Sequence, residues 1–221
     1  MLAALFDVPI ATAELRETAD PSLLDPAEAI CCTAFSPKRR ADFTAGRLCA
    51  RRALEDLGLP AAPVTINADR SPHWPPGVVG SITHTQGFCG AVAAGASAVR
   101  GIGVDAEIIG RVTPDLDRLL LTADERAFLS ALDASSRARA ATIFFSAKEA
   151  FYKCQYAITG QWLDFQDASL RVSNADGSNG FFDVYATLAS AQIAFPLRGR
   201  FVIDGDLVVT GVGVNTRLRS R

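Results

Sequence analysis

The sequence predicts an α+β fold built from two similar halves that dock on each other. Two observations support this prediction. Helical spacing of apolar residues is followed by strand-like alternation twice along the chain, in the same order. Hydrophobic residues also make up 49% of the 221 positions, which is enough to bury a core without disulfides. We expect one half to span residues 1–107 and the other residues 108–221.

The first half begins with a strand and two helices. We expect a strand near the N-terminus, a short helix from Pro26, and a strong helix that begins at Pro37 and ends at Gly58. Proline is tolerated in the first turn of a helix, and glycine followed by proline ends one.

The strong helix carries a basic face. Arg40, Arg47 and Arg51 lie within about 40° of one another around its axis, and Arg39 lies near its start. Such a face is either solvated or a clamp for an anionic ligand, because guanidinium groups match phosphate oxygens. The spacing leaves both interpretations open.

A proline-rich loop, residues 69–77, leads into three apolar segments punctuated by Gly87 and Gly95. We expect these segments to form an antiparallel meander. They are Val78–His84, Phe88–Ala94 and Ala98–Glu107. The first ends in Gly80-Ser-Ile-Thr-His84, whose single histidine is by itself more typical of a structural residue than of a catalytic one.

The third segment ends in Gly101-Ile-Gly-Val-Asp-Ala-Glu107. Strand alternation places Asp105 and Glu107 on the same side. Two carboxylates this close repel each other unless a cation or hydrogen-bond donors lie between them. Mg²⁺ suits the pair, because it favours one or two protein carboxylates together with phosphate oxygens and water. The alternative is an acidic strand end that faces solvent.

The second half repeats the order of helices and strands. Thr122-Ala-Asp-Glu125 has the spacing of a capping box and predicts a helix through Leu132, and a second helix begins at about Ser135. Four strands follow, and Asp204-Gly-Asp206 is a hairpin signal. The expected strands are Ser169–Ser173, Gly180–Ala186, Arg198–Ile203 and Leu207–Val214.

The second helix of this half contains the stretch Phe144–Lys153, which separates into two faces. The apolar face consists of Phe144, Ala147, Phe151 and Cys154. The opposite stripe consists of Thr142, Ser146, Glu149 and Lys153. Periodicity alone favours a solvated ion pair between Glu149 and Lys153, worth about 0.2–0.5 kcal/mol. The alternative is that both charged groups act on one ligand.

Composition excludes several classes of protein. The net charge of −2 argues against a general nucleic-acid or membrane binder, since both need a basic excess. The five cysteines show no CxxC spacing, so we expect reduced core residues of a cytoplasmic protein. Two histidines are too few for a poly-histidine metal centre. No apolar run approaches the roughly 20 residues that span a bilayer.

Three segments, taken together, resemble the signature of the Sfp-type 4′-phosphopantetheinyl transferases. They are Gly80-Ser-Ile-Thr-His84, Gly101-Ile-Gly-Val-Asp-Ala-Glu107 and Phe145-Ser-Ala-Lys-Glu-Ala-Phe-Tyr-Lys153. The likeness is nearest to the branch of siderophore synthases (enterobactin synthase component D-like) and actinobacterial enzymes. It covers most of residues 37–165. Each motif alone is weak evidence, whereas the ordered set is specific.

The resemblance implies a fold, an activity and partners. The two α+β halves would be related by a pseudo-twofold axis, with the ligand in the cleft between them. The enzyme would use Mg²⁺ to transfer the phosphopantetheine arm of coenzyme A to a serine of an apo acyl or peptidyl carrier protein, leaving 3′,5′-ADP. The carriers could belong to siderophore, polyketide, nonribosomal peptide or fatty-acid systems. A monomer is expected, with no nucleic acid and no membrane involved.

The resemblance also assigns roles to residues. Asp105 and Glu107 match the family's Mg²⁺ ligands, and Glu149 matches the third acidic residue of the metal site. Glu149 and Lys153 are the expected catalytic residues, as a base for the serine and as the lysine beside the pyrophosphate. The expected coenzyme A-binding residues are Arg39, Arg47, Arg70, Thr83, His84, Asp105, Glu149 and Lys153.

Three positions depart from the family pattern. Asp69 stands where relatives often have lysine, and Ser71 where they often have glutamate, which would weaken or reshape the coenzyme A contacts. Ala157 replaces a frequent proline, which predicts a looser chain after the catalytic helix.

Two other functions would also use parts of this pattern. One is a coenzyme A or nucleotide binding module that has lost transfer, and the joint presence of Glu149 and Lys153 argues against it, since binding alone needs neither. The other is a nucleic-acid binder that uses the arginine-rich helix, which the acidic balance of the chain disfavours.

Overall fold

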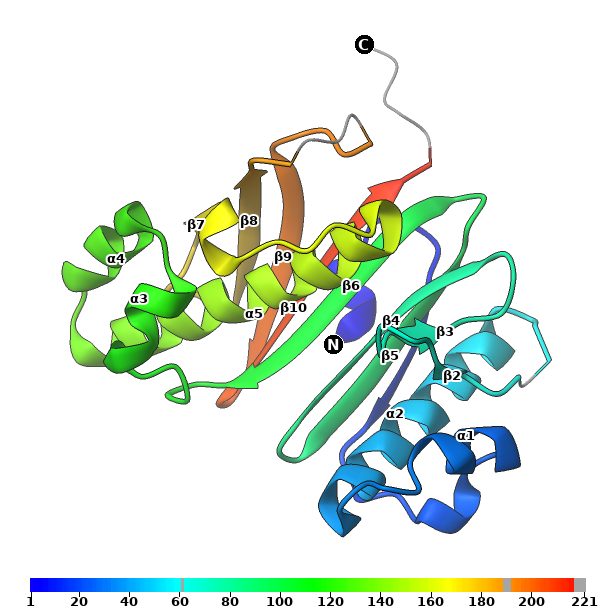
Figure 1. Cartoon of the computed structure of the whole chain (residues 1–221). Coiled ribbons are helices and arrows are strands. Elements are labelled where there is room, and N and C mark those ends of the chain that lie inside the picture. Colours follow the sequence, from blue (N-terminus) through cyan, green and yellow to red (C-terminus); the bar gives the residue numbers. More distant parts are fainter. Residues whose placement is uncertain (61, 189–191, 217–221) are drawn as a thin grey trace.

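The computed structural model describes residues 1–60, 62–188 and 192–216, and Figure 1 shows two antiparallel sheets, each with one long helix on it. Helix α2 (Pro37–Asp56) packs on a three-stranded sheet of order β1-β5-β4. Helix α5 (Ala134–Thr159) packs on a five-stranded sheet of order β6-β10-β9-β8-β7. The predicted α+β class is confirmed, with one helix-on-sheet layer in each part of the chain.

The strands of the two large sheets lie close to the predicted ranges. In the first sheet they are β1 (Ala11–Leu15), β4 (Val78–Thr85) and β5 (Phe88–Gly95). In the second sheet they are β6 (Val99–Ile108), β7 (Ala168–Ser173), β8 (Asn179–Ala186), β9 (Leu197–Asp204) and β10 (Leu207–Asn215). A separate two-stranded sheet pairs β2 (Thr65–Ile66) with β3 (Pro72–His73), and β3 lies within the proline-rich loop at residues 69–77.

The remaining elements are short. The further α-helices are α1 (Pro26–Cys31), α3 (Asp117–Leu120) and α4 (Ala123–Ser130). The 3₁₀ turns are η1 (Leu2–Leu5), η2 (Pro21–Leu23), η3 (Pro114–Leu116) and η4 (Phe165–Asp167). No helix in the described ranges is long and apolar enough to cross a bilayer. All five cysteines are unbridged thiols.

Local signals explain where the main helices begin and end. The Ser36 side chain caps α2 by accepting from the Arg39 amide, and Pro37 occupies the first turn. Helix α4 starts with the predicted capping box between Thr122 and Glu125. Helix α5 is capped by Asp133 and ends at Gly160, whose φ of 63° suits glycine.

Strand β6 corrects the predicted meander. Strands β4 and β5 pair as expected, but β6 pairs with β10, from Leu207 opposite Ile108 to Val214 opposite Gly101. The reason is burial on both faces. One face of β6 lies under α5, and its other face carries Ile102 and Val104 into a core shared with β5 and η1. The division at residues 1–107 and 108–221 stays a prediction. Nearly all of β6 lies before this boundary in the sequence, but the strand pairs with β10, which lies after the boundary.

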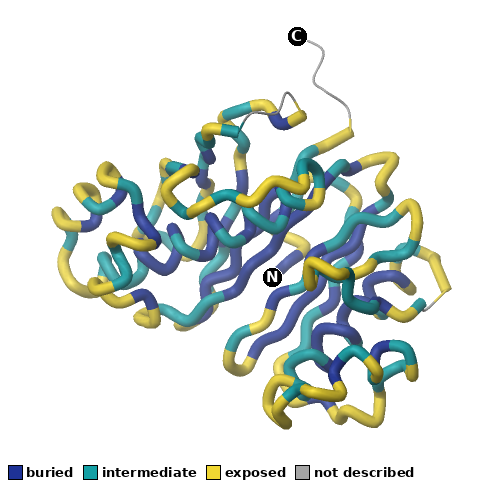
Figure 2. The backbone as a smooth tube through the Cα atoms, viewed as in Figure 1, coloured by how far each residue is buried: buried dark blue, intermediate teal, exposed yellow. Residues whose placement is uncertain are grey.

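The two sheets meet along a seam between β4 and β6, which lie next to each other. In the described residues these two strands belong to different sheets, without a shared ladder. Side chains connect them instead, since Ser81 Oγ accepts from the Val104 amide at 3.1 Å. Figure 2 shows the buried strands converging toward this region from both sides.

Candidate active site

Asp105 and Lys153 form the centre of the candidate site, at the seam between the sheets. Asp105 Oδ1 accepts from Lys153 Nζ at 2.7 Å and from Thr83 Oγ1 at 3.3 Å. Lys153 Nζ also donates to the Val104 carbonyl at 3.1 Å. The interpretation of Glu149 and Lys153 as a simple ion pair is therefore wrong for the described residues, because the lysine reaches across to β6 instead.

Two further carboxylates share this environment. Burial raises the pKa of Glu107 to about 7, and the neighbouring charges of Asp105 and Glu149 add to the increase. Burial also raises the pKa of Glu149, an effect that Lys153 opposes and Asp105 reinforces. Lys153 and Arg111 oppose the increase at Glu107, so the three carboxylates share two nearby cations and the cluster remains short of positive charge.

A Mg²⁺ ion fits this donor set. The Asp105 Oδ2 atom is buried, and no hydrogen-bond partner for it lies in the described ranges. All candidate ligands are oxygens, as Mg²⁺ prefers, and the ion needs only one or two of them when phosphate and water complete its shell. No group of three or more His, Cys, Asp or Glu side chains stands close enough in the described residues to hold a metal by itself.

Arginines gather on the other side of β4. A cavity of about 1070 Å³ is lined by Arg39, Arg47, Arg70 and His84, together with Ile82. Arg39 and Arg70 are exposed, and Arg39 lies 4.7 Å from the centre of the Phe35 ring. This cluster brings together four of the residues that were expected to bind coenzyme A.

The surroundings of Arg47 and His84 lower the pKa of both side chains. Arg47 is buried, donates to the Thr65 carbonyl at 3.2 Å and stacks 4.1 Å from the Phe43 ring centre. Desolvation lowers its pKa to about 10. Desolvation in the cavity also lowers the pKa of His84, with Asp42 opposing and Lys153 reinforcing the effect. In the described residues, neither the Arg47 guanidinium nor the His84 imidazole forms an ion pair with a carboxylate.

Thr83 lies apart from this arginine cluster. Its side chain is 2% exposed and its hydroxyl donates to Asp105. The structure therefore brings Thr83 to the carboxylate cluster and His84 to the arginines, although the two residues are adjacent.

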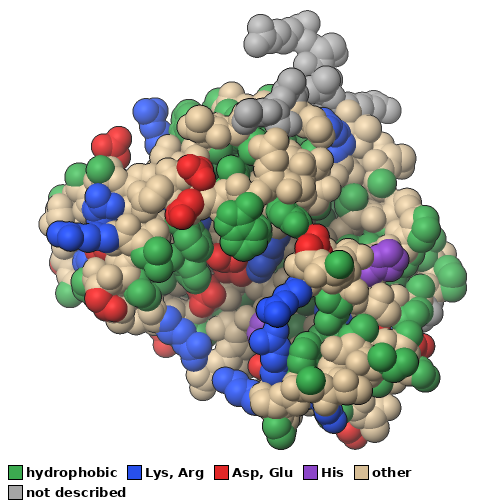
Figure 3. Space-filling model, viewed as in Figure 1, with side chains coloured by type: hydrophobic (Ala, Val, Ile, Leu, Met, Phe, Trp, Pro, Cys, Tyr) green, Lys and Arg blue, Asp and Glu red, His purple; other side chains and the backbone are tan. Residues whose placement is uncertain are grey.

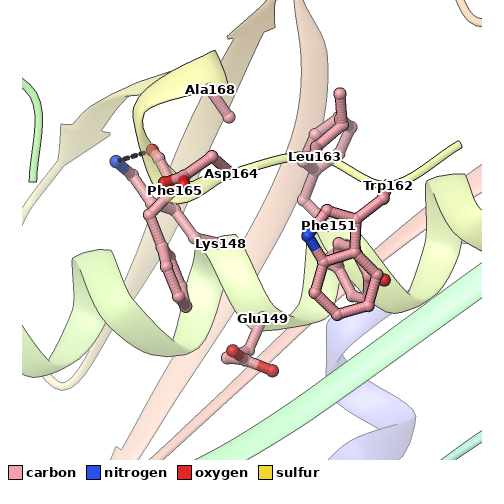
Figure 4. Close-up of a pocket in the computed structure, with 9 residues that line it drawn as sticks. Lys148, Glu149, Phe151, Trp162, Leu163, Asp164, Phe165 and Ala168 are labelled. Atoms are coloured by element: carbon pink, nitrogen blue, oxygen red, sulfur yellow. Dashed lines mark hydrogen bonds between the residues drawn. The ribbon is translucent and has the colours of Figure 1, made fainter. Parts of the chain in front are cut away.

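An apolar pocket lies beside Glu149. It has a volume of about 210 Å³ and is lined mainly by aromatic and aliphatic side chains of α5 and of residues 162–168. Figure 4 shows Glu149 pointing away from Lys148, with Trp162 and Phe165 above the helix. Trp162 is 80% exposed and contacts Tyr152 edge to face, with ring centres 5.2 Å apart.

Lys148 lines this pocket, but its ammonium group is buried in the core and is bonded there. Its ammonium forms a 2.7 Å ion pair with Glu125, and both side chains are 2% exposed. It also donates to the Leu120 carbonyl at 3.0 Å and the Phe165 carbonyl at 2.8 Å, the latter drawn in Figure 4. Sequence reasoning missed this pair, because the capping-box signal at Glu125 does not reveal a second, buried partner.

The separate hollows adjoin one another. A third cavity, of about 690 Å³, shares Arg70 and Ile82 with the arginine cavity and shares Tyr152 and Trp162 with the apolar pocket. It also contains Lys153 and Trp74. A continuous groove therefore runs from the arginines, past the lysine, to Glu149. Figure 3 shows acidic and basic side chains gathered in the hollow across the middle of this face.

The three departures from the family pattern have local explanations. Asp69 Oδ1 accepts from the Ser71 amide at 2.9 Å and its hydroxyl at 2.6 Å, which shapes the turn in which Arg70 adopts a φ of 71°. Ala157 lies inside α5, which continues to Thr159. The expectation of a looser chain after the catalytic helix is therefore wrong.

An α+β fold that joins an arginine cavity, Lys153 with its partner Asp105, and Glu149 in adjoining parts of one groove is typical of an enzyme that acts on a phosphate-bearing ligand. Two family models match: the 4′-phosphopantetheinyl transferase N-terminal domain over residues 25–94 and the 4′-phosphopantetheinyl transferase superfamily over residues 101–204. The chain belongs to the 4′-phosphopantetheinyl transferase family.

Individual relatives support the same assignment. The chain is 38% identical over 201 residues to 4′-phosphopantetheinyl transferase Svp of Streptomyces mobaraensis, covering 88% of this chain and 80% of the relative. It is 36% identical over 194 residues to PptT of Mycobacterium tuberculosis, covering 85% and 84%. It is 30% identical over 183 residues to enterobactin synthase component D of Salmonella typhi, covering 81% and 74%. The predicted resemblance to both branches is confirmed.

Proposed function

We propose that this chain transfers the 4′-phosphopantetheine arm of coenzyme A to a serine of an apo acyl or peptidyl carrier protein and releases 3′,5′-ADP. The observation that carries the proposal is the continuous groove, whose three parts match the three parts of coenzyme A. Arginines lie at one end, Lys153 with its partner Asp105 lies in the middle, and the apolar pocket beside Glu149 lies at the other end.

The arginine end is suited to the nucleotide phosphates. Arg39, Arg47 and Arg70 present guanidinium groups, which bind phosphate oxygens in a bidentate manner. Lys153 would then contact the pyrophosphate, and the pantetheine arm would enter the pocket beside Glu149. An uncharged, extended arm fits the apolar and aromatic lining of that pocket.

Chemistry at the middle of the groove follows from Glu149 and Lys153. The carrier serine Oγ attacks the β-phosphorus of coenzyme A, its proton passes to the Glu149 carboxylate, and the bond to the 3′,5′-ADP oxygen breaks. The raised pKa of Glu149 makes its carboxylate a better proton acceptor. The Lys153 ammonium offsets the negative charge that develops on the departing 3′,5′-ADP.

We further propose that Asp105 and Glu107, with Glu149 as a third candidate, hold Mg²⁺. Two observations support this: Asp105 Oδ2 is buried and has no partner in the described residues, and the carboxylates around Glu107 outnumber the nearby cations. Bound there, the ion supplies positive charge that neutralises pyrophosphate oxygens. Glu149 lines the apolar pocket, so we favour its role as base over its role as ligand.

The deciding experiment is a transfer assay with the intact protein, coenzyme A, magnesium chloride and an apo-carrier protein. Intact-mass spectrometry of the carrier should show one phosphopantetheine adduct, which should be absent when the acceptor serine is replaced by alanine. Coenzyme A binding without an adduct on any carrier tested would support the binding module instead.

The pathway and cellular setting are proposed more coarsely. The relatives include an enterobactin synthase component, so a carrier of siderophore assembly is the first substrate to test, followed by polyketide, nonribosomal peptide and fatty-acid carriers. A monomeric, cytoplasmic enzyme that binds neither nucleic acid nor membrane remains our prediction from the sequence.

A further inference from the structure

Strand β4 divides the motif Gly80-Ser-Ile-Thr-His84 between two environments. Ser81 and Thr83 are buried, at 4% and 2% exposure, whereas Ile82 and His84 line the arginine cavity. This division follows from strand geometry, because successive side chains point to opposite faces. One short strand therefore serves two different parts of the groove.

The buried pair reaches the neighbouring strand β6. Ser81 Oγ accepts from the Val104 amide at 3.1 Å, and Thr83 Oγ1 donates to Asp105 Oδ1 at 3.3 Å. On the other side, Lys153 Nζ donates to the Val104 carbonyl and to the same Asp105 oxygen. Two adjacent residues of β6 are thus held from both sides at the place where, among the described residues, the sheets share no ladder.

These bonds leave a defined arrangement of the Asp105 carboxylate. Oδ1 accepts from both Thr83 and Lys153, while Oδ2 is buried and has no partner in the described residues. A carboxylate held by one oxygen cannot rotate freely, so the other oxygen keeps a fixed direction. Preorganisation of this kind favours a ligand that the free oxygen can bind.

We propose that Ser81 and Thr83 are positioning residues that hold Asp105 ready for the cation, and that Thr83 does not contact coenzyme A. This proposal rests on the proposed function, and it reassigns Thr83 from the ligand-binding role that the family resemblance implied. His84 keeps that role, since it faces the arginines.

Calorimetric titration of coenzyme A into the intact protein, with and without magnesium chloride, tests the proposal without depending on turnover. In the wild type, magnesium should increase the affinity for coenzyme A. Thr83→Val keeps the shape of the side chain and removes the hydroxyl. Without magnesium, its affinity for coenzyme A should stay within about twofold of the wild-type value. The gain from magnesium should fall about tenfold, the effect of losing one hydrogen bond to a charged group. Thr83→Ser should restore it.

Two further variants complete the design. His84→Ala should weaken binding by a similar factor with and without magnesium, since it loses a ligand contact. Ser81→Ala should reproduce the Thr83→Val pattern, and Thr83→Ala replaces Thr83→Val if that variant does not fold.

Equal weakening of coenzyme A binding in Thr83→Val with and without magnesium would overturn the proposal, because it would place the hydroxyl on the ligand. A wild-type affinity that magnesium does not change would overturn it as well. Failure of the proposed function looks different, since the wild type would then show the magnesium gain but attach no arm to any carrier.

Discussion

At the scale of single residues, surroundings decide what each carboxylate of the groove can do. Glu149 is half-buried beside an apolar pocket, has a raised pKa, and forms no ion pair within the described residues. Asp105 is instead bound to a lysine and a threonine. The carboxylate group thus suits proton transfer at one position and a fixed ligand at the other.

Replacing Glu149 by glutamine should remove the base while keeping the shape of the side chain. We expect the transfer rate to fall about 10²–10⁴-fold, the usual contribution of general base catalysis. Intact-mass spectrometry of the carrier over time measures this rate. The melting temperature should stay at or above that of the wild type, because the substitution removes a desolvated charge. Transfer within threefold of the wild type would rule out Glu149 as the base.

Glu107 makes stability depend on pH in a definite direction. Its pKa is about 7 in the folded protein against 4.5 ordinarily, so between these values the folded chain holds a proton that the unfolded chain has released. The stability that protonated Glu107 contributes to the folded protein is therefore complete below pH 4.5 and is lost as the pH rises through 7. This pKa shift corresponds to at most about 3 kcal/mol of the free energy of unfolding.

The matched test compares the wild type with Glu107→Gln by urea denaturation at pH 5 and pH 8 without added metal. The wild type should lose more stability than the variant on going to pH 8. An equal loss in both proteins would show that Glu107 is not the group responsible.

Several residue-scale features could be predicted and others could not. Strand alternation placed Asp105 and Glu107 together, and helical spacing placed Glu149 one turn from Lys153. The partner of Lys153 was not predictable, because contact with Asp105 depends on how α5 packs across β6. The burial of Thr142 and Ser146 was missed for the same reason: Ser146 bonds to Thr210 of β10, so the stripe is not solvated.

At the scale of elements, two glycines of β6 set the distance between strand and helix. A Cβ at Gly103 would collide with the Ala150 carbonyl of α5, and one at Gly101 would lie 2.7 Å from the Cys154 carbonyl. Both obstacles are backbone, which cannot move without shifting the helix. The glycines of the Gly101–Glu107 motif therefore allow α5 to bring Lys153 within reach of Asp105.

Gly103→Ala should therefore both destabilise the protein and slow transfer. We expect a loss of about 1–3 kcal/mol, as for overpacking in a core, with a lower kcat because Lys153 moves with α5. Gly95→Ala on β5 is the matched control, since its Cβ would meet only Ser97 Oγ at 3.6 Å. Urea denaturation and the transfer assay measure the two effects. Equal behaviour of both variants would contradict the close-packing explanation.

Element limits and hairpin pairs were predictable because local signals set them, whereas the pairing of strands far apart in the sequence was not. Pro37 and Gly58 located α2, the capping box located α4, and the Asp204–Asp206 signal located the β9–β10 turn. The start of α5 was predicted at about Ser135 without a named cap, and Asp133 caps it in the structure. The pairing of β6 with β10 joins residues about a hundred positions apart and leaves no local trace. A meander is the simpler expectation when three strands follow one another closely.

At the scale of the whole molecule, the pairing of β6 decides where the chain can be divided. A cut between Ser97 and Ala98 falls in the turn before β6 and leaves the five-stranded sheet intact in one fragment. A cut after Glu107 separates β6 from β10. Residues 1–97 and 98–221, produced together, should therefore associate and retain transfer, whereas residues 1–107 and 108–221 should not.

Co-purification through a tag on one fragment, followed by the transfer assay, measures the outcome. Better recovery from the second pair would favour the division that the order of elements alone predicted.

The order and type of elements followed from the sequence, and the family resemblance pointed to the groove. The side chains that join the sheets, Ser81 and Thr83, became evident only from the packing of the two parts.

The placement of Trp74 and Trp162 along one groove has a spectroscopic consequence. They are the only two tryptophans of the chain, and both line the cavity that contains Lys153. Trp162 is largely exposed, while the Trp74 indole nitrogen is buried. Nearly all the tryptophan emission of this protein therefore comes from the walls of the groove. A ligand that covers Trp162 should shift this emission to shorter wavelength, so that coenzyme A binding can be followed in unlabelled protein.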